Sequence, residues 1–247
     1  MTTPTLGPWL SPQVEIWKSL PKELGTTEAL GEARLQASPR CAFSGAMRAF
    51  ILSGSHRAEA QTLKVARYIQ GRLAATPGTE NFLYSLSGNP LPLWDEASGG
   101  APDELWDPIS RELQAADALV VVTPEWGGMA TPGVKNFLLN CTAGEIGHKP
   151  GLIVTVSATR GGSYPVAELR MSGTKNNRLA WIPEHVIVHH AESNLNAPDG
   201  AADLAKEDQL IRARLGYALR LLAEYSKALH GVRASGVIDH KTFRSGM

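Results

Sequence analysis

Serine, threonine and arginine side chains gather where an apolar run of the sequence gives way to a helical pattern. The stretch "ILSGSHRAEAQTL" supplies the candidates Ser53, Ser55, Arg57, Gln61 and Thr62. A plain turn would explain them, because Ser and Gly favour turns and Ser often caps helices. An anion site would explain them as well, because hydroxyls, a guanidinium and the free N–H groups of a helix N-terminus all donate to phosphate. The stretch by itself leaves both interpretations open.

Two further loops have the same small, glycine-rich character, and each follows an apolar run. The first contains Pro124, Glu125, Trp126, Gly127 and Gly128. The second contains Ser157, Arg160, Gly161 and Gly162. Two glycines after an aromatic residue would let the backbone approach a flat ligand, although a turn before a helix capped by Thr131 also explains them. Three such loops on one edge of a sheet favour a binding site more than any one of them does.

The motifs of several common enzyme classes do not occur in the sequence. There is no G-x-G-x-x-G after the first apolar run, no G-x-x-x-x-G-K-[ST] and no G-x-S-x-G. Histidines at 185, 189 and 190 with Glu192 might suggest a metal, but adjacent residues of a strand point to opposite faces. We therefore expect no metal site, and the sequence identifies no obligatory catalytic acid or base.

Composition narrows the class of protein. The 247 residues suit one sizeable α/β domain, and 24 basic residues balance 24 acidic ones, which gives no electrostatic case for nucleic acid. Cys41 and Cys141 lie far apart without a C-x-x-C motif, as expected of a reducing compartment. The N-terminus lacks the features of a secretory signal, and no apolar run approaches the ~20 residues that cross a bilayer. We expect a cytoplasmic protein without a membrane partner.

Strand and helix patterns alternate from Arg48 onward. The expected strands lie at 48–55, 81–86, 118–126, 151–162 and 181–190. The expected helices lie at 62–73, 104–117 with Pro108 near its first turn, 131–141, 164–173 and 202–231, the last one closed by Gly231. This alternation predicts a doubly wound, five-stranded parallel sheet of order 2-1-3-4-5, whose ligand lies beyond the carboxyl ends of the first and third strands.

The chain divides into two parts in this interpretation. Residues 1–47 are interrupted by prolines, and we expect them to form an N-terminal arm that packs on the main domain or on a partner subunit; a partly disordered tail is the alternative. Residues 48–247 form the α/β domain.

Several sequence blocks resemble the NADPH-dependent FMN reductase family in content and in order. They are "SGSHR…QTL", "LPLWDE", "TPEWGGMATPGVKNFL", "GHKPGLIVTVSATRGG" and "AELR", within residues 48–190. The resemblance implies a flavodoxin-like, FMN-binding domain. It assigns the FMN phosphate to Ser55, Arg57, Gln61 and Thr62, with Ser53 as a further hydroxyl donor beside them. It places the loop 124–128 along the isoalloxazine and Ser157, Arg160, Gly161 and Gly162 on its other side.

The chain departs from the family pattern at three positions. Ala60 stands where a serine is common, and Trp126 and Gly127 stand where tyrosine and asparagine are usual. The resemblance implies an NAD(P)H-dependent oxidoreductase that passes hydride from NADPH or NADH to FMN and then to a small acceptor such as a flavin or quinone. It also implies a homodimer or homotetramer. A flavodoxin-type electron carrier and a flavin-free scaffold are the alternatives.

Overall fold

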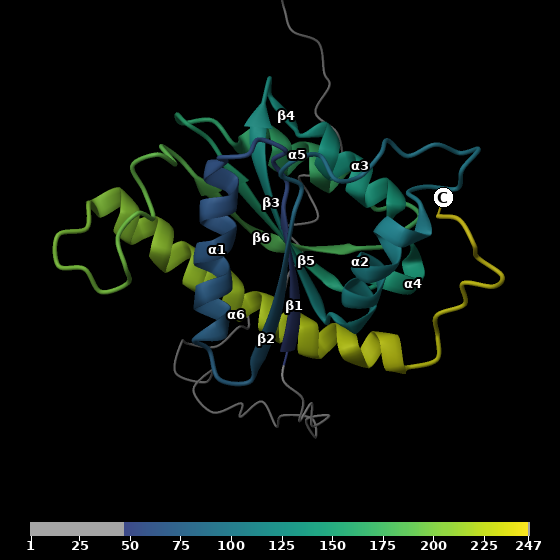
Figure 1. Ribbon diagram of the computed structural model, residues 1–247. Coiled ribbons are helices and arrows are strands. Elements are labelled where there is room, and N and C mark those ends of the chain that lie inside the picture. The colour runs from purple at the N-terminus through teal and green to yellow at the C-terminus, as the bar shows by residue number, and fades with distance from the viewer. Residues whose placement is uncertain (1–46, 247) are drawn as a thin grey trace, which may run out of the picture. The chain divides into compact units, whose positions relative to one another are not determined.

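The computed structural model describes residues 47–246 and contains one parallel sheet. Its strands are β1 (Met47–Ser53), β2 (Thr79–Ser85), β3 (Ala118–Trp126), β5 (Pro150–Val156) and β6 (Ala180–Val188). They are ordered β2-β1-β3-β5-β6, and every neighbouring pair is parallel (Figure 1). Counted among these five strands, this is the predicted doubly wound order. The arm predicted for residues 1–47 lies, except for Met47, outside the described residues.

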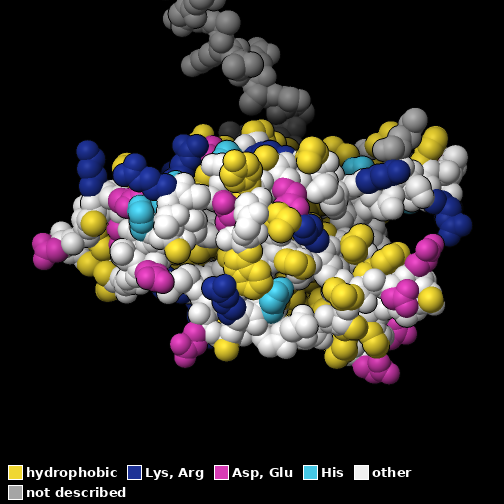
Figure 2. Space-filling view, turned by 90° about the horizontal axis from the view of Figure 1, so that it is seen from above, with side chains coloured by type: hydrophobic (Ala, Val, Ile, Leu, Met, Phe, Trp, Pro, Cys, Tyr) yellow, Lys and Arg dark blue, Asp and Glu magenta, His cyan; other side chains and the backbone are white. Residues whose placement is uncertain are grey.

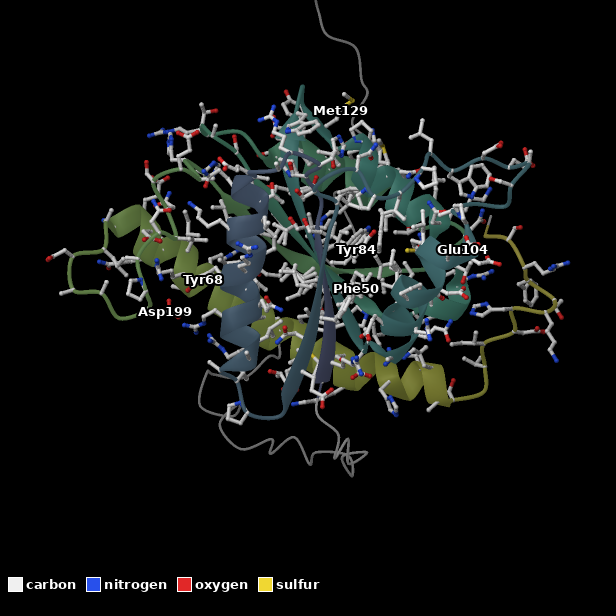
Figure 3. The ribbon with its side chains drawn as sticks, in the orientation of Figure 1. Phe50, Tyr68, Tyr84, Glu104, Met129 and Asp199 are labelled. Atoms are coloured by element: carbon white, nitrogen blue, oxygen red, sulfur yellow. The ribbon has the colours of Figure 1, made fainter. Side chains whose placement is uncertain are left out.

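A sixth strand was not predicted from the sequence. β4 (Met129–Ala130) pairs antiparallel with the end of β3 and forms a short hairpin with it. This hairpin extends beyond the carboxyl end of the parallel sheet, where Figure 3 labels Met129. It therefore lengthens the edge on which a ligand was predicted.

Helices cover both faces of the sheet, as the alternation predicted. They are α1 (Gln61–Ala74), α2 (Asp103–Ala115), α3 (Pro132–Asn140), α4 (Ala143–Ile146), α5 (Ser163–Met171) and α6 (Lys206–Ala234). One buried cluster joins α1 and α6 to alternate residues of the strands, including Ile51 and Val120. A second cluster joins the other four helices to the opposite set, including Phe50 and Val121. Strands with both faces buried read as continuous apolar runs, which is why their positions were evident in the sequence.

Two predicted helix details are wrong. Helix α6 does not end at Gly231 but continues to Ala234, where Ser235 is the C-cap and Gly236 adopts φ +76°. A Cβ at Gly231 would meet open space, so the helix tolerates this glycine at a cost of about 1 kcal/mol relative to alanine. Pro108 is the sixth residue of α2 and lies beyond its first turn. Within residues 47–246, none of the helices has the length and apolar character needed to span a membrane.

Candidate functional site

The loops that follow β1, β3 and β5 meet at one edge of the sheet. The N–H of Gly54 donates to the carbonyl of Val122 over 2.8 Å, which joins the first loop to β3. The rings of His56 and Trp126 meet edge to face, with centroids 4.9 Å apart. The third loop is attached through Gly162, whose N–H donates to the Glu125 carboxylate. Figure 2 looks onto this end of the molecule and shows hydrophobic, basic and acidic side chains intermingled there.

The first loop leaves the start of α1 without a side-chain cap. Its N-cap residue is Ala60, so no serine caps this helix, and that part of the plain-turn explanation is wrong. Ser55 instead accepts the N–H of Arg57 over 3.3 Å, in a local serine turn. A helix N-terminus carries unsatisfied N–H groups and a partial positive charge, which a bound anion can satisfy.

The predicted phosphate residues of this loop differ in exposure. Ser53, Ser55 and Thr62 are buried, whereas Arg57 and Gln61 are exposed. Among the described residues, the hydroxyl of Ser53 and the Nδ1 atom of His56 are buried without a hydrogen-bond partner. A buried polar atom without a partner costs about 1–3 kcal/mol. The loop therefore retains hydrogen-bonding capacity that residues 47–246 do not use.

Arg57 contacts an aromatic ring rather than a carboxylate. Its guanidinium lies 4.8 Å from the centre of the Trp126 ring, and no ion pair within residues 47–246 includes it. The first and second loops thus meet through a cation–π contact, worth about 0.5–1 kcal/mol at an exposed site. The charge of Arg57 is available to an anion at the neighbouring N-terminus of α1.

The second loop is a two-residue hairpin turn between β3 and β4. Trp126 pairs with Met129, and Gly127 and Gly128 between them adopt φ values of +56° and +76°. Such a turn needs positive φ at both central residues, which favours Gly-Gly. The turn explanation of these glycines is confirmed, and a close approach to a flat ligand stays a prediction.

Two carboxylates fix this hairpin to the elements beside it. Glu125 accepts the N–H of Gly162, and Glu168 on α5 accepts the N–H of Ala130 over 2.7 Å. Glu168 also pairs with Lys135 over 2.9 Å. Burial raises the pKa of Glu168, but the hydrogen bonds from Lys135 and Ala130 outweigh burial and hold this pKa below its usual value. Glu168 therefore stays ionised as a positioning group for the hairpin.

The start of α3 is formed as predicted and joins two of the sequence blocks. Thr131 caps the helix by accepting the N–H of Val134 over 3.4 Å, and Pro132 is the first helical residue. Asn136 accepts the N–H of Trp94 over 2.7 Å and donates to the carbonyl of Pro92 over 2.8 Å. The "LPLWDE" block is thereby anchored to α3.

The third loop resembles the first in its local geometry. Ser157 accepts the N–H of Thr159 over 3.3 Å, as Ser55 does for Arg57. Arg160 is exposed, Gly162 is buried, and Ser157 and Gly161 are half-buried. The Thr155 hydroxyl at the end of β5 is buried without a partner. Neither Thr155 nor His56 was among the predicted site residues, because an unpaired buried atom leaves no signal in sequence.

Of the histidines at 185, 189 and 190, only His185 lies in β6, and His189 and His190 directly follow this strand. His190 donates its N–H to the carbonyl of Thr159 over 3.2 Å, and the Nδ1 of His189 is buried without a partner. Burial lowers the pKa of His185. Within residues 47–246, no three metal-ligating side chains cluster.

A separate cleft of about 460 Å³ lies beside α3 and α5. Its lining includes Trp94, Leu138, Leu139 and Leu169, with Lys135 and Lys175 as charged members. None of the predicted cofactor residues lines it. The cleft and the strand-end site are therefore distinct features.

The fold is a doubly wound α/β sheet whose three loops meet at its carboxyl edge, and comparison gives the family. A profile of the family described as "NADPH-dependent FMN reductase" matches residues 47–193, which is more than half of the chain. The chain belongs to this family, and it is accordingly an NAD(P)H-dependent flavoprotein oxidoreductase.

Individual relatives agree with this assignment. An NADPH azoreductase of Bacillus sp. (strain OY1-2) is 28% identical over 157 residues, which cover 62% of this chain and 81% of that protein. The structure of the flavoenzyme NAD(P)H:(acceptor) oxidoreductase FerB of Paracoccus denitrificans has a TM-score of 0.56 at 19% identity and covers 74% of this chain and 98% of its own. An apo NADH:FMN oxidoreductase has a TM-score of 0.55 at 15% identity, covering 74% and 89%. At these identities the two structures show the shared fold alone.

Proposed function

We propose that residues 48–247 bind FMN at the carboxyl edge of the sheet and use it to oxidise NADPH or NADH at the expense of a small acceptor. The observation that carries the proposal is the unused hydrogen-bonding capacity of the first loop. The start of α1 has no side-chain cap, and the hydroxyl of Ser53 is buried without a partner beside it. These are the donors that a phosphomonoester needs, so the residues present fit the phosphate of FMN.

Each loop would have a distinct task toward the cofactor. Ser53, Ser55, Arg57, Gln61 and Thr62 would hold the phosphate, the loop 124–128 would line one side of the ring, and Ser157, Arg160, Gly161 and Gly162 would lie on the other. When bound, FMN supplies the redox chemistry, because it accepts hydride from a reduced nicotinamide and passes electrons on to an acceptor. The protein's contribution is to orient the rings and to present backbone N–H groups where negative charge develops.

The second loop supports a stacked arrangement of flat molecules. Trp126 is half-buried and is held by His56 and Arg57, while Met129 and Tyr164 nearby are 47% and 69% exposed. The exposed side chains of Tyr164 and Met129 lie beside an indole ring that is held in place, and such a surface suits planar, conjugated acceptors. Free flavins, quinones and azo compounds are the classes to test, the last of these because the Bacillus relative is an NADPH azoreductase.

The association of identical subunits is part of this proposal. The cleft beside α3 and α5 has a mainly apolar lining, in which Leu139 is 60% exposed, and Met171, next to the lining residue Ser172, is 85% exposed. Exposed Asp95 and Glu96 follow Trp94 on one side of the cleft, and exposed Lys175 belongs to its lining. A two-fold axis would bring these opposite charges of two copies together. Light scattering of the purified full chain measures the oligomeric state.

The test of the function is flavin binding to the full chain, followed by anaerobic mixing with NADPH and with NADH. We expect Arg57→Ala to weaken FMN binding about 10- to 100-fold, since a hydrogen bond to a charged group contributes roughly 1.5–3 kcal/mol. The matched control is Arg67→Ala, because Arg67 is an exposed arginine within α1.

Three results would contradict the proposal. Unchanged FMN affinity in Arg57→Ala would place the phosphate elsewhere. A wild-type chain that binds no flavin would support the scaffold. A flavin-loaded chain whose absorbance bleaches only slowly with either nicotinamide would support the electron carrier.

A further inference from the structure

Lys64 on α1 makes an unusual set of contacts with a distant segment of the chain. Its Nζ donates to the carbonyl of Ala191 over 2.5 Å, to the carbonyl of Asn194 over 2.8 Å and to Oδ1 of Asn196 over 2.7 Å. All three acceptors are neutral oxygens, and together they use the three donors of the ammonium. We refer to these three hydrogen bonds as the Lys64 bridge.

The segment on the far side of the bridge, residues 189–196, is held by its own hydrogen bonds and by α6. Ala191, Asn194 and Leu195 are buried, and the Asn194 amide donates to the carbonyl of His189 over 2.9 Å. The N–H of Leu195 donates to the Asp208 carboxylate over 3.1 Å. These contacts hold the segment in one conformation, so a shift at one end of it would move the other end as well.

This segment holds the third loop of the candidate site. The N–H of Ala191 donates to the carbonyl of Ser157 over 3.0 Å, and the N–H of His190 donates to the carbonyl of Thr159 over 3.2 Å. At its other end the bridge starts only two residues after Thr62, in the first turns of α1. One side chain thus connects the helix that begins at the first loop with the segment that supports the third.

Two further residues on the same face of α1 contact Asp199, which follows this segment in the chain. Tyr68 donates to Asp199 over 2.8 Å, and Arg72 pairs with Asp199 over 2.7 Å; Figure 3 shows Tyr68 and Asp199 side by side. Residues 64, 68 and 72 recur every four positions, so they lie on one face of α1. Of the three, only Lys64 bonds to the stretch that directly holds Ser157 and Thr159.

We propose that Lys64 is a positioning residue that sets the distance and orientation between the first loop and the third loop. The first loop is the phosphate half of the proposed FMN site, and the third loop belongs to its ring half. This inference rests on the proposed function. A ligand that spans both halves gains affinity from the correct spacing, whereas a ligand that occupies one half does not. None of the three side-chain hydrogen bonds of Lys64 goes to a predicted cofactor residue, so its replacement should change the spacing of the loops rather than a contact with the ligand.

The experiment compares three ligands with four forms of the full chain. FMN spans both halves, riboflavin occupies the ring half, and inorganic phosphate occupies the first loop. We expect Lys64→Met to raise the Kd for FMN about tenfold while the Kd values for riboflavin and phosphate change less than about twofold. Lys64→Arg keeps a cationic donor and should return the FMN Kd to within about threefold of wild type.

Lys149→Met is the matched control. Lys149 also donates to two carbonyls, those of Leu113 and Gln114, but it lies at the opposite edge of the sheet. Its removal should leave the FMN-to-riboflavin affinity ratio unchanged. In hydrogen exchange, the amides of His190 and Ala191, which donate to the third loop, should lose protection in Lys64→Met and keep it in Lys149→Met.

The outcomes separate this inference from the proposed function. If wild type binds FMN and Lys64→Met binds it equally well, the positioning role is wrong and the function stands. If FMN and riboflavin weaken by the same factor, Lys64 supports only general stability and the inference is again wrong. If wild type binds no FMN, both proposals fail.

Discussion

The two ends of the parallel sheet differ in how many of their buried polar groups have hydrogen-bond partners within residues 47–246. At the end where β3 begins, Lys149 donates to two carbonyls of α2, over 2.7 and 2.9 Å, and Asp117 accepts the N–H of Arg48 over 2.9 Å. At the end where β1 and β5 finish, Ser53, His56 and Thr155 each keep a buried polar atom without a partner. Of the six such atoms within residues 47–246, a fourth at this end belongs to His189, which directly follows β6.

This contrast supports the proposal that the ligand binds at the carboxyl end of the sheet. Folding alone favours the satisfied arrangement, because each unpaired buried group costs about 1–3 kcal/mol. A protein can carry that cost where a bound molecule later supplies the missing partners. The two remaining unpaired atoms are Nδ1 of His185, in the middle of β6, and Nε1 of Trp181, near the amino end of that strand, so the difference between the two ends is one of number.

The strongest disruption of the carboxyl end should come from Gly54→Ala. A Cβ at Gly54 would lie 2.2 Å from Cγ2 of Val134 and 2.9 Å from the carbonyl oxygen of Val122. Neither β3 nor α3 can move away without losing core packing, so we expect a loss of about 3 kcal/mol in the free energy of unfolding. Urea denaturation followed by circular dichroism measures it.

Gly71→Ala is the control for this substitution. Gly71 lies within α1, and a Cβ there would meet nothing within 4 Å. This variant should gain about 0.5–1 kcal/mol from helix propensity. A Gly54→Ala protein as stable as wild type would show that the first loop is not closely packed on β3 and α3.

The opposite end of the sheet gives a pH-dependent prediction through Lys149. Burial lowers the pKa of Lys149 from 10.5 to about 8 in the folded protein. Between these two values the unfolded chain binds more protons than the folded one, so this lysine makes stability rise with pH. Between pH 8 and 10 the wild type should gain about 2 kcal/mol of unfolding free energy relative to Lys149→Met.

The comparison with Lys149→Met is needed because another buried group acts in the opposite direction. Burial raises the pKa of the Cys141 thiol well above 9.0 in the folded protein. Once the pH exceeds the pKa of this thiol in the unfolded chain, the thiol makes the free energy of unfolding fall as the pH rises. Both proteins contain Cys141, and its effect cancels in their difference. Lys175→Met, at an exposed lysine, should follow wild type across the whole range. A difference that stays flat from pH 8 to 10 would mean that Lys149 is not desolvated.

The sequence was informative where structure is determined by neighbours along the chain. Strand β3 lies at 118–126 as predicted, because a strand buried on both faces is a continuous apolar run, and the cap at Thr131 followed from the Thr-Pro pair. Gly231 misled the prediction of the end of α6, since a glycine near a helix end resembles a C-cap whether or not the chain turns there.

The rest of the site depends on contacts between residues far apart in sequence. The acceptors of Lys64 lie more than 120 positions away, and Glu125 meets Gly162 across 37 positions. No local pattern distinguishes a lysine that bridges two segments from one that is solvated. For the two glycines of the β3–β4 turn the sequence favoured ligand approach over a plain turn before the Thr131 cap, and only the strand pairing and the φ values show the hairpin.

The smallest expected effect is that of Glu125→Gln, which tests the contact between the second and third loops at the carboxyl end of the sheet. Glu125→Gln keeps the length and an acceptor oxygen but removes the charge that strengthens the hydrogen bond from Gly162. A hydrogen bond to a charged group contributes about 1 kcal/mol more than a neutral one, so exchange of the Gly162 amide should quicken about fivefold. Global stability should change by less than about 0.5 kcal/mol, because Glu125 is only half-buried.

Glu168→Gln provides the contrast, because Glu168 accepts a backbone N–H and also pairs with Lys135. Its removal should quicken exchange at Ala130 and leave Gly162 as in wild type. If Glu125→Gln leaves the exchange rate of Gly162 unaltered, the carboxylate does not connect the second and third loops, and the carboxyl end of the sheet would then lose one of the contacts that make its three loops a single site.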